Sequence, residues 1–138
     1  MLRRAVLAAW LAVIAGPTAA YSNAAEYLIA QEVSAACDGG AGTIAPKAVI
    51  ERDLTGDGRA DLILAHDGIA CAGGRRSYAC GAQVCSVLIY VRRGQLLKLE
   101  EELLGTGVSV DGSSVPEIRF FGHGGGARSI RWDGQAFR

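Results

Sequence analysis

The stretch from residue 53 to residue 61 places oxygen-bearing side chains at alternate positions around a glycine. Proteins bind calcium through roughly six to eight oxygen atoms at about 2.3 to 2.6 Å, and a short loop supplies them when alternate residues point inward and a glycine permits a sharp bend. The spacing therefore predicts a calcium loop. Its candidate ligands are four side chains and, at the seventh loop position, one main-chain carbonyl: Asp53, Thr55, Asp57, Asp61 and the carbonyl of Arg59, with Gly58 at the bend.

Apolar and β-branched residues flank this loop on both sides. Residues 47–54 lead into it, and residues 60–65 leave it as a mostly apolar run typical of a buried strand. An EF-hand loop is instead flanked by helices and ends in a glutamate at its twelfth position, which is Leu64 here. We therefore expect the loop to be the turn of a β-hairpin. The alternative is a hairpin turn whose aspartates accept backbone N–H groups without an ion, although three closely spaced carboxylates favour a cation.

The loop also follows the pattern Asp-x-Asn-x-Asp-Gly-x-x-Asp-Leu, with Thr55 in place of the asparagine. The agreeing residues are Asp53, Asp57, Gly58, Asp61 and Leu62. On these residues the segment 49–64 resembles the calcium loop of the FG-GAP and VCBS repeats, in which the loop joins two strands of a propeller blade and its ninth position closes the site. A propeller needs at least four blades, and the chain contains no second copy of the loop. The resemblance therefore implies a local strand-loop-strand unit and not a propeller.

The first 20 residues are typical of an export signal. Two arginines precede an apolar run from Ala5 to Ala15, and small residues follow it. This run is shorter than the roughly 20 residues that span a bilayer as a helix, so we expect a removed peptide and no membrane span in the mature chain. Cleavage is expected after the triplet 18–20, or as late as Ala24 after the triplet 22–24. Residues 25–138 then form a single exported domain, periplasmic or secreted.

Four cysteines follow the predicted cleavage site: Cys37, Cys71, Cys80 and Cys85. An even number of cysteines in an exported chain favours two disulfides. Zinc is less favoured, because the gaps of 34, 9 and 5 residues contain no Cys-x-x-Cys pair. If the strands beside the calcium loop are antiparallel, all four sulfurs lie at the sheet end opposite the loop, so all three pairings remain open. We favour the pairs Cys37–Cys71 and Cys80–Cys85.

The remaining pattern predicts an α+β fold that is mainly antiparallel β. Apolar residues near helical spacing indicate one N-terminal helix over residues 24–36, ended by the glycines of the segment 37–40. The helix is expected to pack on a disulfide-braced sheet of five to seven strands. Residues 66–83 are expected to form a long connection, and residues 96–104 a strand or a short helix.

The charge pattern excludes a typical nucleic-acid binder. Removing the signal takes two of the 14 basic residues, which leaves 14 − 2 = 12 against 14 acidic residues. The arginines are scattered singly or in pairs among acidic residues, whereas nucleic-acid binders carry a strongly basic face. Arg75 and Arg76 form one such pair in the cysteine-rich segment, where they suit contact with an acidic partner and equally suit a loop that faces water.

No complete catalytic motif is present in the sequence. His66 precedes an aspartate and His123 precedes three glycines, but no Gly-x-Ser-x-Gly segment accompanies them. We therefore expect an exported domain with a structural calcium ion that acts by binding or as an envelope accessory protein, not as an enzyme, with a protein partner that the sequence does not name. The alternatives are a periplasmic inhibitor of an enzyme such as lysozyme, and a small hydrolase that uses His66 or His123 with carboxylates.

Calcium titration tests the loop directly. We expect calcium to bind the mature protein and, at a free concentration 100 times Kd, to raise the free energy of unfolding by about 2.7 kcal/mol. Isothermal calorimetry measures the binding, and Asp57→Ala removes the ligand at the fifth loop position as a control. Equal heats for the two proteins, or a melting temperature that chelation leaves unchanged, would contradict the prediction.

Overall fold

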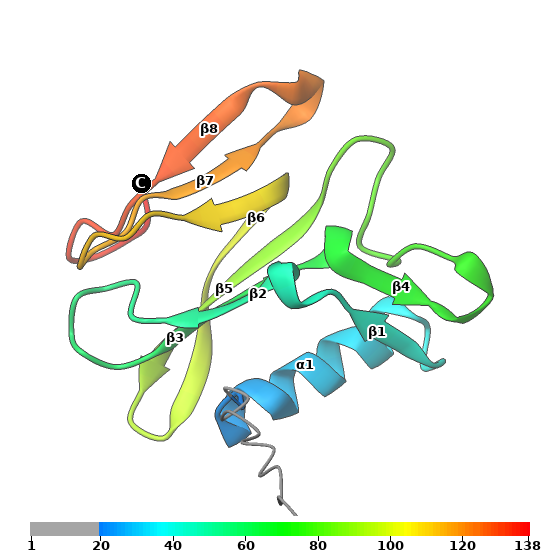
Figure 1. Ribbon diagram of the computed structural model, residues 1–138, viewed down its shortest axis with the longest axis horizontal. Coiled ribbons are helices and arrows are strands. Elements are labelled where there is room, and N and C mark those ends of the chain that lie inside the picture. Colours follow the sequence, from blue (N-terminus) through cyan, green and yellow to red (C-terminus); the bar gives the residue numbers. More distant parts are fainter. Residues whose placement is uncertain (1–19) are drawn as a thin grey trace, which may run out of the picture.

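One helix packs on a curved antiparallel sheet in the computed structural model, which describes residues 20–138 (Figure 1). The predicted export signal lies outside the described residues, except for Ala20. The helix is α1 (Asn23–Ala36), and it is not long and apolar enough to cross a bilayer, nor is any other described helix. The expected class, α+β with one N-terminal helix on a mainly antiparallel, disulfide-braced sheet, is confirmed.

The main sheet has six strands in the order β2-β3-β5-β6-β7-β8, and every neighbouring pair is antiparallel. Its strands are β2 (Val49–Arg52), β3 (Asp61–Ala65), β5 (Cys85–Arg93), β6 (Leu96–Val110), β7 (Ile118–Phe121) and β8 (Ala127–Ile130). A separate pair consists of β1 (Gly42–Ile44) and β4 (Ile69–Cys71). Short 3-10 turns join several strands: η1 (Pro46–Ala48), η2 (His66–Gly68), η3 (Ala72–Gly74) and η4 (His123–Gly125).

Both ends of α1 follow from the sequence. Ser22 is its N-cap, because the Ser22 Oγ accepts the backbone N–H of Ala25 at 3.3 Å. At the other end Asp38 and Gly39 adopt left-handed backbone conformations, with φ of 54° and 74°. The N–H of Gly39 donates to the carbonyl of Ser34 at 2.8 Å. The glycine-rich stop that the sequence predicts is therefore confirmed.

Apolar residues fill two cores on the two faces of the sheet. Leu62 and Leu64 of β3 pack with α1, and Ile63 and Ala65 of the same strand pack between the two halves of the curved sheet. All residues of β3 are buried, because this strand is covered on both faces. That burial explains why β3 is nearly continuous in apolar residues instead of alternating.

The sheet curves until its first strand meets the loop between β6 and β7. The guanidinium of Arg52 donates to the carbonyls of Asp111 and Ser113 at 2.6 and 2.7 Å. The long strand β6 shifts register against both of its neighbours, and such bulges bend a strand. Gly56 packs against the same region, since a Cβ on it would lie 2.8 Å from Val115 Cγ2. The 53–61 loop is thus held beside the loop between β6 and β7.

Two segments are more ordered than the sequence suggests. The expected long connection over residues 66–83 contains β4. The strand expected as one alternative over residues 96–104 is confirmed, and it continues to Val110 as β6. The strands β1 and β4 have only three residues each, so they show no readable alternation. They pair Gly42 with Cys71, and a Cβ on Gly42 would lie 2.5 Å from Cys37 Sγ. The small pair of strands therefore depends on glycine and on the disulfide beside it.

Two disulfides join Cys37 to Cys71 and Cys80 to Cys85. The favoured pairing is confirmed, and no described cysteine is free. The first disulfide ties the end of α1 to β4, and the second closes a short loop that leads into β5. Both lie at the end of β3 opposite the 53–61 loop, as the hairpin argument predicts. The two disulfides indicate an oxidising extracellular or periplasmic environment.

The two disulfides are expected to contribute unequally to stability. Sequence separations of 34 and 5 residues correspond to about 4 and about 2 kcal/mol in the chain-entropy relation, because a longer loop restricts the unfolded chain more. Cys37→Ala/Cys71→Ala should therefore lower the free energy of unfolding in urea more than Cys80→Ala/Cys85→Ala, which serves as its control. A larger loss from the short-loop pair would contradict this ranking.

Candidate functional site

Asp61 holds the predicted metal loop from inside the protein. It is the first residue of β3 and is 0% exposed. Its Oδ2 accepts the backbone N–H of Leu54 at 2.8 Å, and its Oδ1 accepts the backbone N–H of Arg92 at 2.8 Å. Burial raises the pKa of the Asp61 carboxyl, and the charges of Asp57 and Asp53 add to this effect, against the two hydrogen bonds. The carboxylate therefore ties the start of the loop to β5.

The side chain of Asp53 closes the loop by accepting hydrogen bonds from backbone N–H groups within it. Its Oδ1 accepts the N–H groups of Thr55 and Gly56 at 3.0 and 2.7 Å, and its Oδ2 accepts the N–H of Gly58 at 2.7 Å. Gly56 and Gly58 both have φ of 82°, a conformation that favours glycine. Burial alone acts to raise the pKa of Asp53, but the hydrogen bonds from Gly58, Gly56 and Thr55 hold it below its ordinary value. The loop thus satisfies this carboxylate itself.

The other predicted ligands point in different directions. The Thr55 Oγ1 lies 3.5 Å from Asp61 Oδ2, on the inner side of the loop. Asp57 faces outward, with its side chain 35% exposed, and its Oδ1 accepts the backbone N–H of Arg59 at 2.9 Å. The Arg59 guanidinium contacts the other oxygen of Asp57 at 3.2 Å. A cation of the protein itself therefore lies beside this carboxylate.

This geometry corresponds to the ion-free hairpin that the sequence left open. Four of the five predicted ligands lie in the loop between β2 and β3, and Asp61 is the first residue of β3. Asp61 turns inward, and Asp57 turns toward Arg59. Within residues 20–138, no three His, Cys, Asp or Glu side chains converge in a way that would hold a metal ion. The loop residues in this arrangement do not form a calcium cage, and calcium binding stays a prediction.

A buried polar chain lies at the opposite end of β3. His66 follows that strand and is 3% exposed. Its Nδ1 lies 2.8 Å from Ser77 Oγ, and its Nε2 lies 3.4 Å from Glu32 Oε2. The Ser77 Oγ accepts the N–H of Ala79 at 3.1 Å, so the serine proton is free to bond the imidazole. The hydroxyl of Tyr90 donates to Glu32 Oε1 at 2.9 Å.

The charges of this chain are set mainly by contact with Glu32. The contact with His66 lowers the pKa of the Glu32 carboxyl, with a further contribution from Tyr90, while burial opposes them. Burial raises the pKa of the Tyr90 hydroxyl, and the contact with Glu32 raises it further. Glu32 is therefore a carboxylate and Tyr90 a neutral donor at neutral pH.

Sequence reasoning missed Ser77 and Glu32 as partners of His66. A serine, a histidine and an acid form the residue set of a nucleophilic triad, but Ser77 and His66 are each 3% exposed. A substrate carbonyl has no open approach to the serine hydroxyl in this arrangement. His123 lies instead in the exposed turn η4. The chain of contacts positions the segment that contains Ser77.

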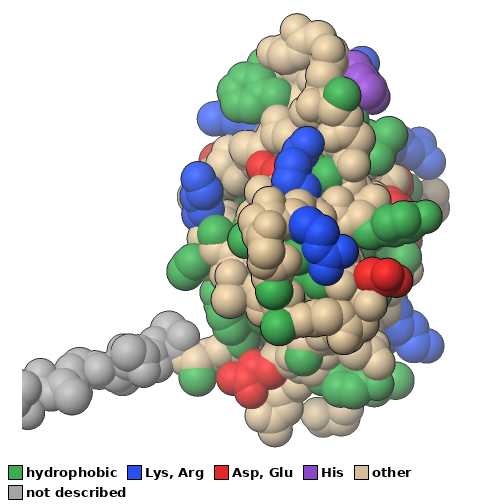
Figure 2. Space-filling view, turned by 90° about the vertical axis from the view of Figure 1, so that its right-hand side faces the viewer, with side chains coloured by type: hydrophobic (Ala, Val, Ile, Leu, Met, Phe, Trp, Pro, Cys, Tyr) green, Lys and Arg blue, Asp and Glu red, His purple; other side chains and the backbone are tan. Residues whose placement is uncertain are grey.

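That segment, residues 72–84, is called the cysteine loop below. It presents a tyrosine directly after the buried serine: Ser77 is 3% exposed, whereas Tyr78 is 89% exposed. The backbone N–H of Tyr78 donates to the carbonyl of Ala36 at the end of α1, at 2.7 Å. The loop contains two arginines and no acidic residue. Figure 2 looks onto this side of the molecule and shows basic side chains near the middle of the face.

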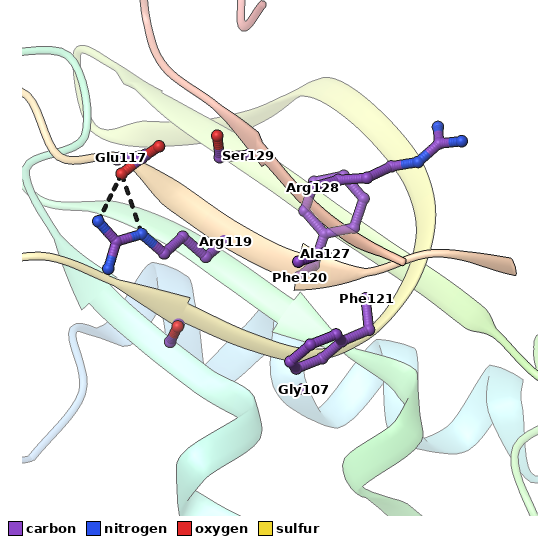
Figure 3. Close-up of a pocket in the computed structure, with 9 residues that line it drawn as sticks. Gly107, Glu117, Arg119, Phe120, Phe121, Ala127, Arg128 and Ser129 are labelled. Atoms are coloured by element: carbon purple, nitrogen blue, oxygen red, sulfur yellow. Dashed lines mark hydrogen bonds and ion pairs between the residues drawn. The ribbon is translucent and has the colours of Figure 1, made fainter. Parts of the chain in front are cut away.

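A shallow cavity of about 320 Å³ lies over β6, β7 and β8. Glu117 and Arg119 both line it and bond each other directly (Figure 3), since one oxygen of Glu117 accepts two guanidinium N–H groups at 2.9 and 2.6 Å. The neighbouring Ser129 hydroxyl and then the contact with Arg119 hold the pKa of Glu117 below its ordinary value. Phe121 lies at its side and is 49% exposed. Glu117 and Arg119 thus pair with each other, and Arg128 is the remaining charged residue that lines the cavity. This pairing makes the cavity a weaker candidate than the cysteine loop.

Comparison with known proteins assigns no family: the chain matches no family model, no curated protein and no solved structure. The functional proposal below rests on the contacts, burial and charge of the described residues.

Asp61 should matter far more to stability than Asp57. Asp61→Asn places an amide NH₂ against the N–H of Leu54 or Arg92, so a buried donor loses its acceptor, and we expect a loss of about 2 kcal/mol in the free energy of unfolding. Asp57→Asn is the matched control, with an expected change within about 0.5 kcal/mol because its contacts are at the surface. Urea unfolding with a chelator present measures both. Similar losses for the two variants would show that the inward contacts of Asp61 are not decisive.

Proposed function

We propose that the protein is an exported binding domain, periplasmic or secreted, that acts as an envelope accessory protein and recognises a protein partner through its cysteine loop. The observation that carries the proposal is the contrast between Ser77, which is 3% exposed, and Tyr78, which is 89% exposed. The large aromatic side chain of Tyr78 therefore extends into solvent directly after a residue that is fixed inside the protein. Free aromatic side chains in such settings are typical of interaction surfaces.

Rigidity of the cysteine loop supports this role. Cys71 precedes the loop and is bound to Cys37, while Cys80 within it is bound to Cys85. Between these bridges the Ser77 hydroxyl contacts His66 at 2.8 Å. A loop that is fixed before binding loses less conformational entropy in a complex, which raises affinity. Folding and disulfide formation have already removed that conformational entropy before the partner binds.

The chemistry of the loop suits an acidic partner. Tyrosine and arginine are the residue types most enriched among those that dominate binding energy. Arg75 and Arg76 are both exposed, and no acidic residue lies within the loop. Opposite charge across an interface increases the association rate and the specificity. We therefore propose an acidic protein surface as the partner.

An inhibitor of a periplasmic glycosidase such as lysozyme is a narrower form of this proposal. Glycosidases carry a pair of carboxylates in an open cleft, and a rigid loop with one tyrosine and two arginines is complementary to such a cleft. The structural calcium ion remains part of the proposal. Asp57, whose side chain is 35% exposed, is the carboxylate that such an ion would reach from solvent, and the ion would brace the 53–61 loop.

The hydrolase alternative has one observation in its favour, the contact of Ser77 and Glu32 with His66. It predicts turnover that Ser77→Ala and His66→Ala abolish, or a dependence on His123. We favour binding because the serine hydroxyl is enclosed, whereas the adjacent tyrosine is open to solvent.

Photo-crosslinking in producing cells tests the binding surface. A photoreactive phenylalanine analogue in place of Tyr78 should give a protein adduct that mass spectrometry identifies. The same analogue in place of Tyr27, which is 63% exposed on α1, should not give that adduct.

Affinity measurements with the purified partner give a second test. Tyr78→Ala should raise Kd about 30-fold, which corresponds to about 2 kcal/mol of binding free energy, and should leave the melting temperature unchanged. Arg75→Ala/Arg76→Ala should reduce the salt dependence of binding. An unchanged Kd for Tyr78→Ala would exclude this surface.

A further inference from the structure

Ser22 is built into the folded domain through four contacts. Its backbone N–H donates to Glu51 Oε2 at 2.9 Å, and its carbonyl accepts the N–H of Glu26 at 2.9 Å. Its Oγ accepts the N–H of Ala25 at 3.3 Å and the guanidinium of Arg92 at 3.1 Å. The residue before the first helical residue therefore connects α1 to both β2 and the end of β5.

These contacts distinguish the two cleavage positions that the sequence allows. Cleavage after Ala24 would remove the Ser22 cap and its bonds to Glu51 and Arg92, and the loss of an N-cap destabilises a helix. It would also remove Tyr21 and Ala24, which pack against the core between α1 and the sheet. Cleavage after Ala20 keeps all of these contacts.

The carboxylate of Glu51, at the same place, lacks a hydrogen-bond donor for one of its oxygens. Its Oε1 is buried and has no hydrogen-bond partner among the described residues. The nearest cationic atom, Arg92 Nη2, lies 3.6 Å away, and both side chains are largely buried, at 12% and 13% exposure. Other guanidinium nitrogens of Arg92 donate to the carbonyls of Ala60 and Gln95, at 3.1 and 3.4 Å. A buried carboxylate oxygen without a donor is costly.

We propose that the mature chain begins at Tyr21 and that its α-ammonium group is the missing donor for Glu51. The nitrogen of Tyr21 precedes that of Ser22 by one residue, a step of at most about 3.8 Å along the chain, and Ser22 already bonds the same carboxylate. The inference rests on the export part of the proposed function and is independent of the cysteine loop.

The processing step is a hydrolysis catalysed by a signal peptidase. Water adds to the carbonyl carbon of Ala20, the bond from that carbon to the nitrogen of Tyr21 breaks, and a carboxylate and an amine are formed. The amine takes up the proton that the new carboxylic acid releases and becomes an ammonium group. A neutral amide thus becomes a cation beside Glu51. The carboxylate offsets the unfavourable position of that cation next to the positive end of α1.

The test uses protein exported from the complete precursor and purified from the periplasm or medium. Intact mass and N-terminal sequencing are expected to give Tyr21 as the first residue, whereas a chain that begins at Ala25 would overturn the proposal. NMR titration of the α-amino group is expected to show a pKa about one unit above the ordinary range of about 7.7 to 8.0. Arg92 and the helix end oppose this shift, and Glu51 produces it. Glu51→Gln should abolish it, whereas Glu26→Gln, in the exposed first turn of α1, should keep it.

Unfolding measurements give a second test should Glu51→Gln fail to fold. A group whose folded-state pKa is raised contributes stability that is complete below its unfolded pKa and is lost as pH rises through the folded value. The unfolding constant of the mature protein should therefore increase about sevenfold between pH 7 and pH 9.5, relative to protein acetylated at Tyr21. Parallel pH profiles for the two forms would overturn the ion pair. Tyr78 variants do not affect either result, so this proposal and the binding proposal fail separately.

Discussion

The hydrogen bonds of the Asp61 carboxylate are the constraint on which the rest of the structure depends. They join the N–H of Leu54 to that of Arg92, and so fix where β3 starts and how it faces β5. The side chain of Arg92 continues the connection to Ser22 at the N-terminus of α1. One buried carboxylate thus connects a loop, two strands and, through Arg92, the helix. Its charge is tolerated because backbone donors surround it, which is the condition for burying an acid.

The buried strand β3 has a group of polar contacts at each of its two ends. At its start Asp61 organises the 53–61 loop, and immediately after its end His66 contacts Ser77 and Glu32. The first group produces a closed turn in which aspartates bond backbone amides. The second group fixes the cysteine loop against α1. The surface that we assign to binding is therefore supported by the same buried strand as the predicted metal loop, from the opposite end.

Local chemistry made the hairpin, the helix and the disulfides predictable. The 53–61 loop carries its own turn signals, α1 shows helical spacing and a glycine stop, and the hairpin places the four cysteines at one end of the sheet. The contacts of His66 with Ser77 and Glu32 were not predictable, because they depend on the short strands β1 and β4, which have no pattern. The length of β6 was also missed. Gly105 resembles a break in the sequence, yet a Cβ there would lie 2.6 Å from Phe120 Cδ2, so the glycine admits close packing within a continuous strand.

The disulfide between Cys37 and Cys71 determines when the cysteine loop can take its folded form. It lies beside the pairing of Gly42 with Cys71 and precedes the cysteine loop. In a reducing cytosol this bridge does not persist, and the short strands β1 and β4 lack the length to hold together alone. In the export and binding role that we propose, the cysteine loop would therefore be completed only after translocation, and the newly made chain would not engage cytosolic proteins.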